Sequence, residues 1–134
     1  MNGSNTGFAV ARYNVDGTLD TTFNGIGKVA TASGAGSDEA TSLAIDSTGR
    51  LVVAGYSQNG SIYDIALARY KEDGALDPTF NGTGIVTAAF GSGNNFANAL
   101  AIDASGRIVV GGTSESGAGS GFAVARYNAN GTLD

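Results

Sequence analysis

ARYNVDGTLDTTFNGIG, residues 11–27, is the stretch that decides the fold, because the chain carries it more than once. It returns as ARYKEDGALDPTFNGTG at 68–84 and begins again as ARYNANGTLD at 125–134. The interval between successive copies is 57 residues in both cases. Self-similarity at a fixed period of this size indicates a repeat architecture, in which each repeat is one supersecondary unit.

The period also sets the expected domain organisation. We expect complete repeats at 8–64 and 65–121, the start of a third at 122–134, and a small polar leader at 1–7 outside the fold. The leader has neither the basic nor the apolar segment of a signal peptide. The third copy stops at Asp134, where the earlier copies continue into Thr-Phe-Asn-Gly, so this end resembles a fragment boundary.

Composition excludes several classes of protein and site. There is no cysteine and no histidine, which rules out disulfides, thiolate metal sites, and Ser-His-Asp or Cys-His catalysis. With 7 basic residues against 12 acidic ones, the net charge of −5 argues against nucleic acid, whose phosphates need Lys and Arg clusters. No apolar run reaches the roughly 18 residues of a membrane span.

Each repeat contains four short apolar runs. The runs 41–46 and 51–56 flank a short loop with glycine, which predicts a hairpin. The run 63–70 is largely apolar on both faces, so we expect a strand buried between two neighbours. A fourth run lies at 84–90, and its more polar counterpart at 27–32 carries a lysine, which is typical of an outer strand. No helical periodicity is sustained over ten residues.

Four short antiparallel strands in roughly 40–55 residues make one blade of a β-propeller. The predicted fold is therefore all-β, with the chain reading as the last two strands of one blade, a complete blade, and the first three strands of another. Propellers close with roughly four to eight blades. We therefore expect the chain to complete a ring by homo-oligomerisation, with a head-to-tail trimer preferred over a tetramer.

The segment 11–27, followed by SLAIDSTGRLVVAG at 42–55, resembles the bacterial delta-60 repeat, also described as a β-propeller domain of unknown function. The resemblance covers residues 8–134. Asn24 and Asn81 depart from it, since the family often has glycine there. The resemblance implies tandem copies in large bacterial proteins that are secreted or held at the cell surface. It supplies no catalytic residues.

An arginine and an aspartate recur eight residues apart in every copy. One interpretation is a ring of arginine-lined ligand pockets, one in each blade. The favoured interpretation is a buried ion pair that joins two segments of a blade, because both partners persist while the loops change. Two recurring phenylalanines are expected to fill the core. These residues are Arg12, Arg69, Arg126, Asp20, Asp77, Asp134, Phe23 and Phe80.

The segment Asn14–Asp20 has the alternating oxygen side chains of a calcium loop. In the second copy Lys71 replaces Asn14, and in the third Asn130 replaces Asp16. An ammonium group does not suit a ligand position, so we expect a glycine-containing turn. The prediction is that the chain binds no metal and no cofactor.

The copies differ most at 31–39 against 88–96 and at 56–64 against 113–121. Tyr56, Gln58, Tyr63 and Asp64 have the counterparts Thr113, Glu115, Ser120 and Gly121. Loops on a rigid scaffold are common binding sites, so these four are possible ligand contacts; they are equally explained as unselected spacers.

The sequence favours a non-enzymatic structural or binding module, with itself and a protein or glycan as possible partners. A lectin-like, carbohydrate-binding propeller is the first alternative, although the chain has no tryptophan to stack on sugars. A propeller hydrolase or lyase is less favoured because histidine is missing.

Overall fold

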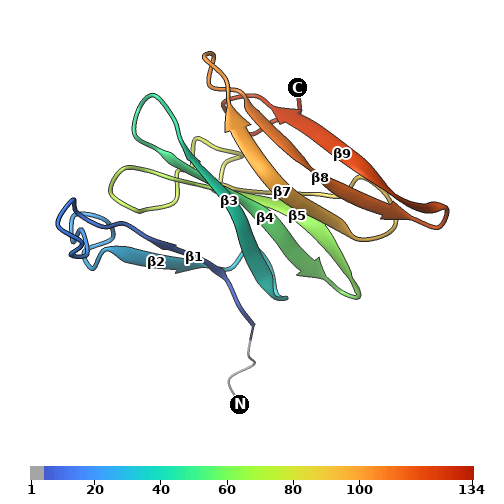
Figure 1. Ribbon diagram of the computed structural model, residues 1–134, viewed down its shortest axis with the longest axis horizontal. Helices are drawn as coiled ribbons and strands as arrows, with labels where there is room; N and C mark the ends of the chain where they lie inside the picture. The colour runs from blue at the N-terminus through green and yellow to red at the C-terminus, as the bar shows by residue number, and fades with distance from the viewer. Residues whose placement is uncertain (1–4) are drawn as a thin grey trace.

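Residues 5–134 fold into nine β-strands that form three antiparallel sheets, side by side in chain order (Figure 1). The computed structural model describes residues 5–134. No helix occurs in this range, so none there could cross a membrane. The strands are β1 (Phe8–Ala11), β2 (Lys28–Thr31), β3 (Asp38–Ile45), β4 (Leu51–Asn59), β5 (Ile62–Tyr70), β6 (Ile85–Ala88), β7 (Asn95–Ile102), β8 (Ile108–Ser116) and β9 (Gly119–Tyr127).

The order in which the strands pair confirms the predicted division of the chain into two strands of one blade, one complete blade and three strands of another. The central sheet pairs β3-β4-β5-β6 and is one complete four-stranded blade. The sheet before it contains only β1 and β2, and the sheet after it contains β7-β8-β9. The first sheet therefore lacks the two strands that open a blade, and the last lacks the strand that ends one.

Local turn chemistry explains why each blade begins with a hairpin. In the β3–β4 turn, the Asp46 carboxylate accepts the Thr48 backbone N–H at 2.8 Å, and Gly49 has φ of 82°. In the β7–β8 turn, Asp103 and Gly106 repeat the arrangement. An aspartate that bonds two residues on, followed by a glycine with positive φ, fixes the loop and with it the strand register.

A bulge follows in each of these hairpins. The register of β3 against β4 shifts between Ala40 and Ser42, and the intervening Thr41 donates its hydroxyl to the Ala97 carbonyl oxygen at 2.6 Å in the next sheet. Opposite the bulge lies Gly55, where a Cβ atom would overlap the Glu39 carbonyl group. The bulge thus joins two blades and requires a glycine on the facing strand.

The core lies between the sheets, and β5 contributes to both halves of it. One face of β5 carries Ala66 and Ala68, which pack in a cluster with Phe8 of β1. The other face carries Ile65 and Leu67, which pack against the third sheet. The prediction of a strand buried on both faces is confirmed for the central blade. The alanines leave space for the large side chains of the preceding blade.

The expectation that residues 1–7 lie outside the fold is wrong for Thr6. The Asp38 backbone N–H donates to the Thr6 carbonyl oxygen at 2.9 Å, and the Thr6 hydroxyl donates to the Asp38 carbonyl oxygen at 3.0 Å. The reason is the repeat register, which places Thr6 at the position of Tyr63 in the next copy. The part of the expected leader at 1–4 lies outside the described residues.

The bulge generates a prediction about two adjacent glycines in the third sheet. In Gly112→Ala, the new Cβ would overlap the Phe96 carbonyl group, as at Gly55 in the previous blade. We expect a loss of about 1–3 kcal/mol in the free energy of unfolding, measured by urea denaturation. Gly111→Ala is the control, because its Cβ meets open space and the equivalent residue of the central blade is Ala54. Equal losses in the two variants would contradict the steric explanation.

Candidate functional site

The recurring arginine of the first repeat, Arg12, donates hydrogen bonds to three groups and stacks on a phenylalanine ring. Arg12 donates Nε to Asp20 Oδ2 at 2.7 Å and Nη2 to Thr22 Oγ1 at 2.9 Å. Its Nη1 donates to the Glu72 carbonyl oxygen at 2.7 Å, in the turn of the following repeat. The guanidinium also lies over the Phe23 ring, 4.9 Å from its centroid. We call this arginine, with its aspartate, its threonine and the carbonyl of the next repeat, the arginine latch.

The second repeat builds the same latch with deeper burial. Arg69 donates Nε to Asp77 Oδ2 at 2.9 Å and Nη2 to Thr79 Oγ1 at 2.9 Å, and Nη1 to the Ala129 carbonyl oxygen. It lies over the Phe80 ring at 4.7 Å. The Arg69 side chain is 2% exposed and that of Asp77 is 5% exposed. Protein groups therefore occupy the planar fork of this arginine, which leaves it no donor face for a ligand.

The third copy retains only the first part of the latch. Arg126 pairs with Asp134, but its side chain is 49% exposed, and within residues 5–134 it reaches no carbonyl of a following repeat. The structure thus pairs the predicted partners in every copy, and it buries Phe23 and Phe80 completely. These contacts favour the ion-pair interpretation over the arginine-lined pockets.

A backbone contact accompanies each complete latch. The Asn24 N–H donates to the Asp73 carbonyl oxygen at 2.7 Å, and the Asn81 N–H donates to the Asn130 carbonyl oxygen at 2.7 Å. Both donors have φ of 52°, in the left-handed region that glycine favours and asparagine tolerates. The two asparagines that depart from the delta-60 pattern therefore occupy positions whose positive φ suits glycine or asparagine.

Arg50 extends the charged cluster into the β3–β4 turn. It lies 2.7 Å from Asp46 Oδ2 and 3.6 Å from Asp77 Oδ2. Burial alone would raise the pKa of Asp46, but hydrogen bonds from Thr48 and Arg50 outweigh it and lower this pKa to about 2. Burial likewise opposes ionisation of Asp77, yet hydrogen bonds from a threonine two residues on and the charge of Arg69 lower its pKa. Both carboxylates are therefore fixed as anions and suit structural ion pairing.

The calcium-like segment forms a hydrogen-bonded turn. Asp16 Oδ1 accepts the Thr18 backbone N–H at 3.0 Å and the Thr18 hydroxyl at 2.7 Å. Asn14 Nδ2 donates to the same hydroxyl at 3.0 Å. These contacts match the expected turn.

The four divergent residues separate into two groups on the β4–β5 hairpin. Tyr56 and Tyr63 form an aromatic cluster with Phe96 of the next sheet, with ring centroids 4.8–5.6 Å apart. A hydrogen bond to Glu39 raises the pKa of Tyr56 to about 12. Gln58 and Asp64 instead line a polar pocket.

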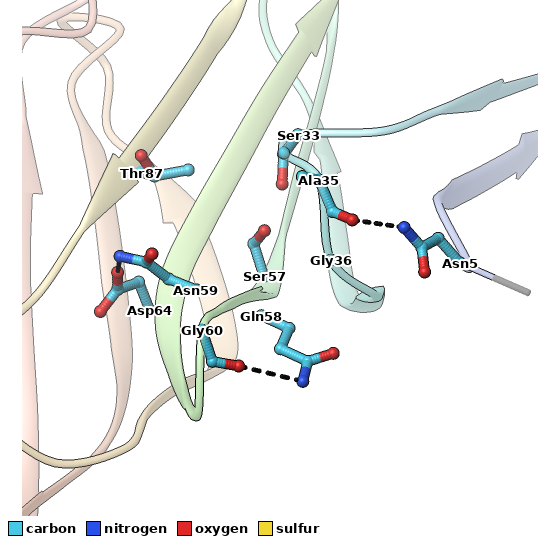
Figure 2. Close-up of a pocket in the computed structure, with 11 residues that line it drawn as sticks. Asn5, Ser33, Ala35, Gly36, Ser57, Gln58, Asn59, Gly60, Asp64 and Thr87 are labelled. Carbon is cyan, nitrogen blue, oxygen red and sulfur yellow. Dashed lines mark hydrogen bonds between the residues drawn. The ribbon is translucent and has the colours of Figure 1, made fainter. Parts of the chain in front are cut away.

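The polar pocket has a volume of about 550 Å³ and lies between the β2–β3 loop and the tip of the β4–β5 hairpin (Figure 2). Asp64 is only 7% exposed. Its Oδ2 accepts a hydrogen bond from Asn59 Nδ2 at 2.9 Å, whereas its Oδ1 has no hydrogen-bond partner within residues 5–134. Sequence reasoning missed the other wall residues, among them Asn59 and Ser57. Ser57 is directly opposite Asp64 in the β4–β5 register, which the hairpin spacing could have indicated.

The latch predicts strong coupling between Arg69 and Asp77. Each single alanine variant leaves a buried charge without its partner, so each should lose about 3–5 kcal/mol of unfolding free energy. The double variant should lose less than the sum of the two losses, as a double-mutant cycle measures. The exposed Arg126–Asp134 pair is the matched control and should couple by no more than about 1 kcal/mol. Equal coupling in both pairs would show that burial is irrelevant.

Acid should destabilise the fold through Asp46. Its pKa is about 2 in the folded chain against 3.8 ordinarily, so the unfolded chain binds the proton more readily. The stabilisation is complete above about pH 4 and is lost as the pH falls towards 2. Melting temperatures measured across this range should fall less steeply in Asp46→Asn than in the unaltered chain. An identical slope in the two proteins would contradict this assignment.

Comparison with known proteins agrees with the architecture. No curated protein matches the chain. One family model matches residues 1–23, 47–80 and 104–134, which together make up more than half of the sequence and recur with the period of the repeat. That family is described as "Domain of unknown function (DUF5122) beta-propeller". With blade topology and repeated motifs in agreement, the chain belongs to this β-propeller family of unknown function.

Proposed function

We propose that the chain is a non-enzymatic structural module that closes a β-propeller ring with further copies of itself. The ring would act as a rigid scaffold whose loops are free to bind a partner. Support comes from an unfinished interface at each end of the row of sheets.

The observation that carries the proposal is a large apolar surface on β9. Phe122 is 100% exposed and Val124 is 68% exposed. Their counterparts on β5 are Ile65 and Leu67, which are 1% and 0% exposed because the third sheet covers them. Burying a side chain of this kind contributes roughly 1.5–3 kcal/mol. Equivalent faces of β5 and β9 are thus buried in one case and exposed in the other.

A second copy of the chain supplies the missing cover. The third sheet lacks its outer strand, and β2 of another copy has the sequence and length to pair with β9 as β6 pairs with β5. This arrangement would place Phe122 and Val124 against the central blade of that copy, where Phe8 now packs. Head-to-tail association through one repeated interface closes into a ring when the rotation permits.

In this ring, β1 and β9 of neighbouring copies would compete for the same place beside β2. The β8–β9 hairpin pairs nine residues on each strand, whereas β1 pairs four residues with β2. The turn after β9 is also fixed to the central blade, through the Ala129 and Asn130 carbonyl oxygens. We therefore assign the position to β9 and expect β1 to be displaced in the ring. Two blades per chain then give six blades in a trimer, which is the preferred assembly.

Light scattering after size exclusion tests the ring. The expected mass is three times the 13.3 kDa of one chain and constant over a range of protein concentrations. Phe122→Asp should reduce the mass to that of one chain, because a carboxylate cannot be buried on this face without a partner. Val15→Asp is the control, since Val15 is fully exposed in a turn away from the sheets, and it should leave the trimer intact.

Two results would overturn the proposal. A compact monomer at micromolar concentration would show that the β9 surface needs no cover. A mass that rises continuously with concentration would show open association rather than a closed ring.

A further inference from the structure

We propose that the polar pocket beside Asp64 binds an organic cation, an alkylammonium or guanidinium group, with the Asp64 carboxylate as its anionic contact. The pocket is built by the β2–β3 loop and the β4–β5 hairpin of one chain.

The first support is the incomplete bonding of Asp64. Buried polar atoms in proteins are nearly always hydrogen-bonded, and each one left without a partner costs about 1–3 kcal/mol. Asn59 donates a hydrogen bond to Oδ2, but no atom in the part of the chain that the structure describes donates one to Oδ1. A ligand that donates a hydrogen bond would complete the set.

The second support is that the blade does not need an aspartate at this position. The counterparts of Asp64 in the neighbouring copies are Gly7 and Gly121, and both copies still form the strand concerned. A buried carboxylate without a cationic partner is costly, so its presence in the central copy alone requires an explanation outside the fold. Recognition of a cation supplies one.

The chemistry of the walls sets the class of ligand. Among residues 5–134, Asp64 is the only charged residue that lines the pocket, and no aromatic residue lines it. The wall amides each use one donor within the wall: Asn59 Nδ2 donates to Asp64, and Gln58 Nε2 donates to the Gly60 carbonyl oxygen at 3.2 Å, as Figure 2 shows. Each amide nitrogen carries two hydrogens, so both amides keep one N–H donor beside their carbonyl oxygens. The Asp64 carboxylate therefore favours a ligand that donates hydrogen bonds and carries positive charge.

The size and shape of the pocket favour an extended organic cation over a metal ion. A volume of about 550 Å³ falls in the usual range of small-molecule sites. Gly36 brings the loop against the hairpin, since a Cβ there would overlap the Gln58 backbone. A calcium ion takes six to eight oxygen ligands, usually with several carboxylates, and this pocket offers one carboxylate. A lysine or arginine side chain of another protein and a free amine present the same chemistry.

The test is an amide chemical-shift titration of the ¹⁵N-labelled full chain with N-acetyl-lysine methylamide. We expect saturable shifts at Ser57, Asn59 and Asp64 in the millimolar range. Asp64→Asn keeps the shape of the side chain and should weaken binding by about tenfold or more. Asp73→Asn removes the same charge from an exposed turn and should leave binding unchanged. The norleucine analogue, which lacks the ammonium group, should produce no saturable shifts.

Further arms of the titration identify the source and can refute the site. Tighter binding of putrescine than of the lysine amide would support a free amine as the ligand, and the reverse order would support a protein side chain. The proposal is overturned if the lysine amide causes no shifts at these residues, if Asp64→Asn binds as well as the unaltered chain, or if the norleucine analogue binds equally. Saturable shifts at the same residues with calcium chloride would also overturn it, because the pocket would then be a metal site.

Discussion

The contact on which the rest of the structure depends is the hydrogen bond from each latch arginine to a backbone carbonyl of the following repeat. Arg69 holds its own blade together through Asp77 and Thr79, and with its remaining nitrogen it holds the next blade through Ala129. One buried side chain therefore couples folding within a repeat to docking between repeats. In repeat proteins, stability is the sum of such intrinsic and neighbour contributions, and neither is sufficient alone. In the arginine latch, one guanidinium group makes both the contacts within a repeat and the contact to the next repeat.

Packing between blades follows a rule of small against large. Ala66 and Ala68 receive Phe8 on one side of β5, while Ile65 and Leu67 project into the next blade from the other side. Strand alternation enforces this division, because neighbouring residues point to opposite faces. A sheet with one recessed and one projecting face stacks in a single direction, and this directionality is what an array of identical units needs to curve consistently.

The sequence was sufficient for the parts of the fold that are written in side-chain patterns. The interval between copies located the repeats, and apolar runs with Asp-x-x-Gly turns located the strands and the phase of the blades. It was insufficient where the partner is a backbone atom, as for the Ala129 carbonyl, since any residue supplies that group. Thr6 was misjudged because its polar side chain concealed its register with Tyr63. At the candidate site, strand alternation could have separated Tyr56 from Asp64, but only three dimensions reveal that Asp64 Oδ1 is without a partner.

The acceptor chosen by the latch has a consequence for how such arrays evolve. Glu72 and Ala129 occupy equivalent turns with unrelated side chains, yet both offer the same carbonyl to the preceding arginine. The contact between neighbouring repeats therefore does not depend on which residue occupies this turn position. Turns can diverge in sequence, and whole repeats can be duplicated, deleted or recombined in any order, without loss of the contact that joins them. A gene built from such units can change its blade number in one step, while the exposed loops of each unit accumulate substitutions independently.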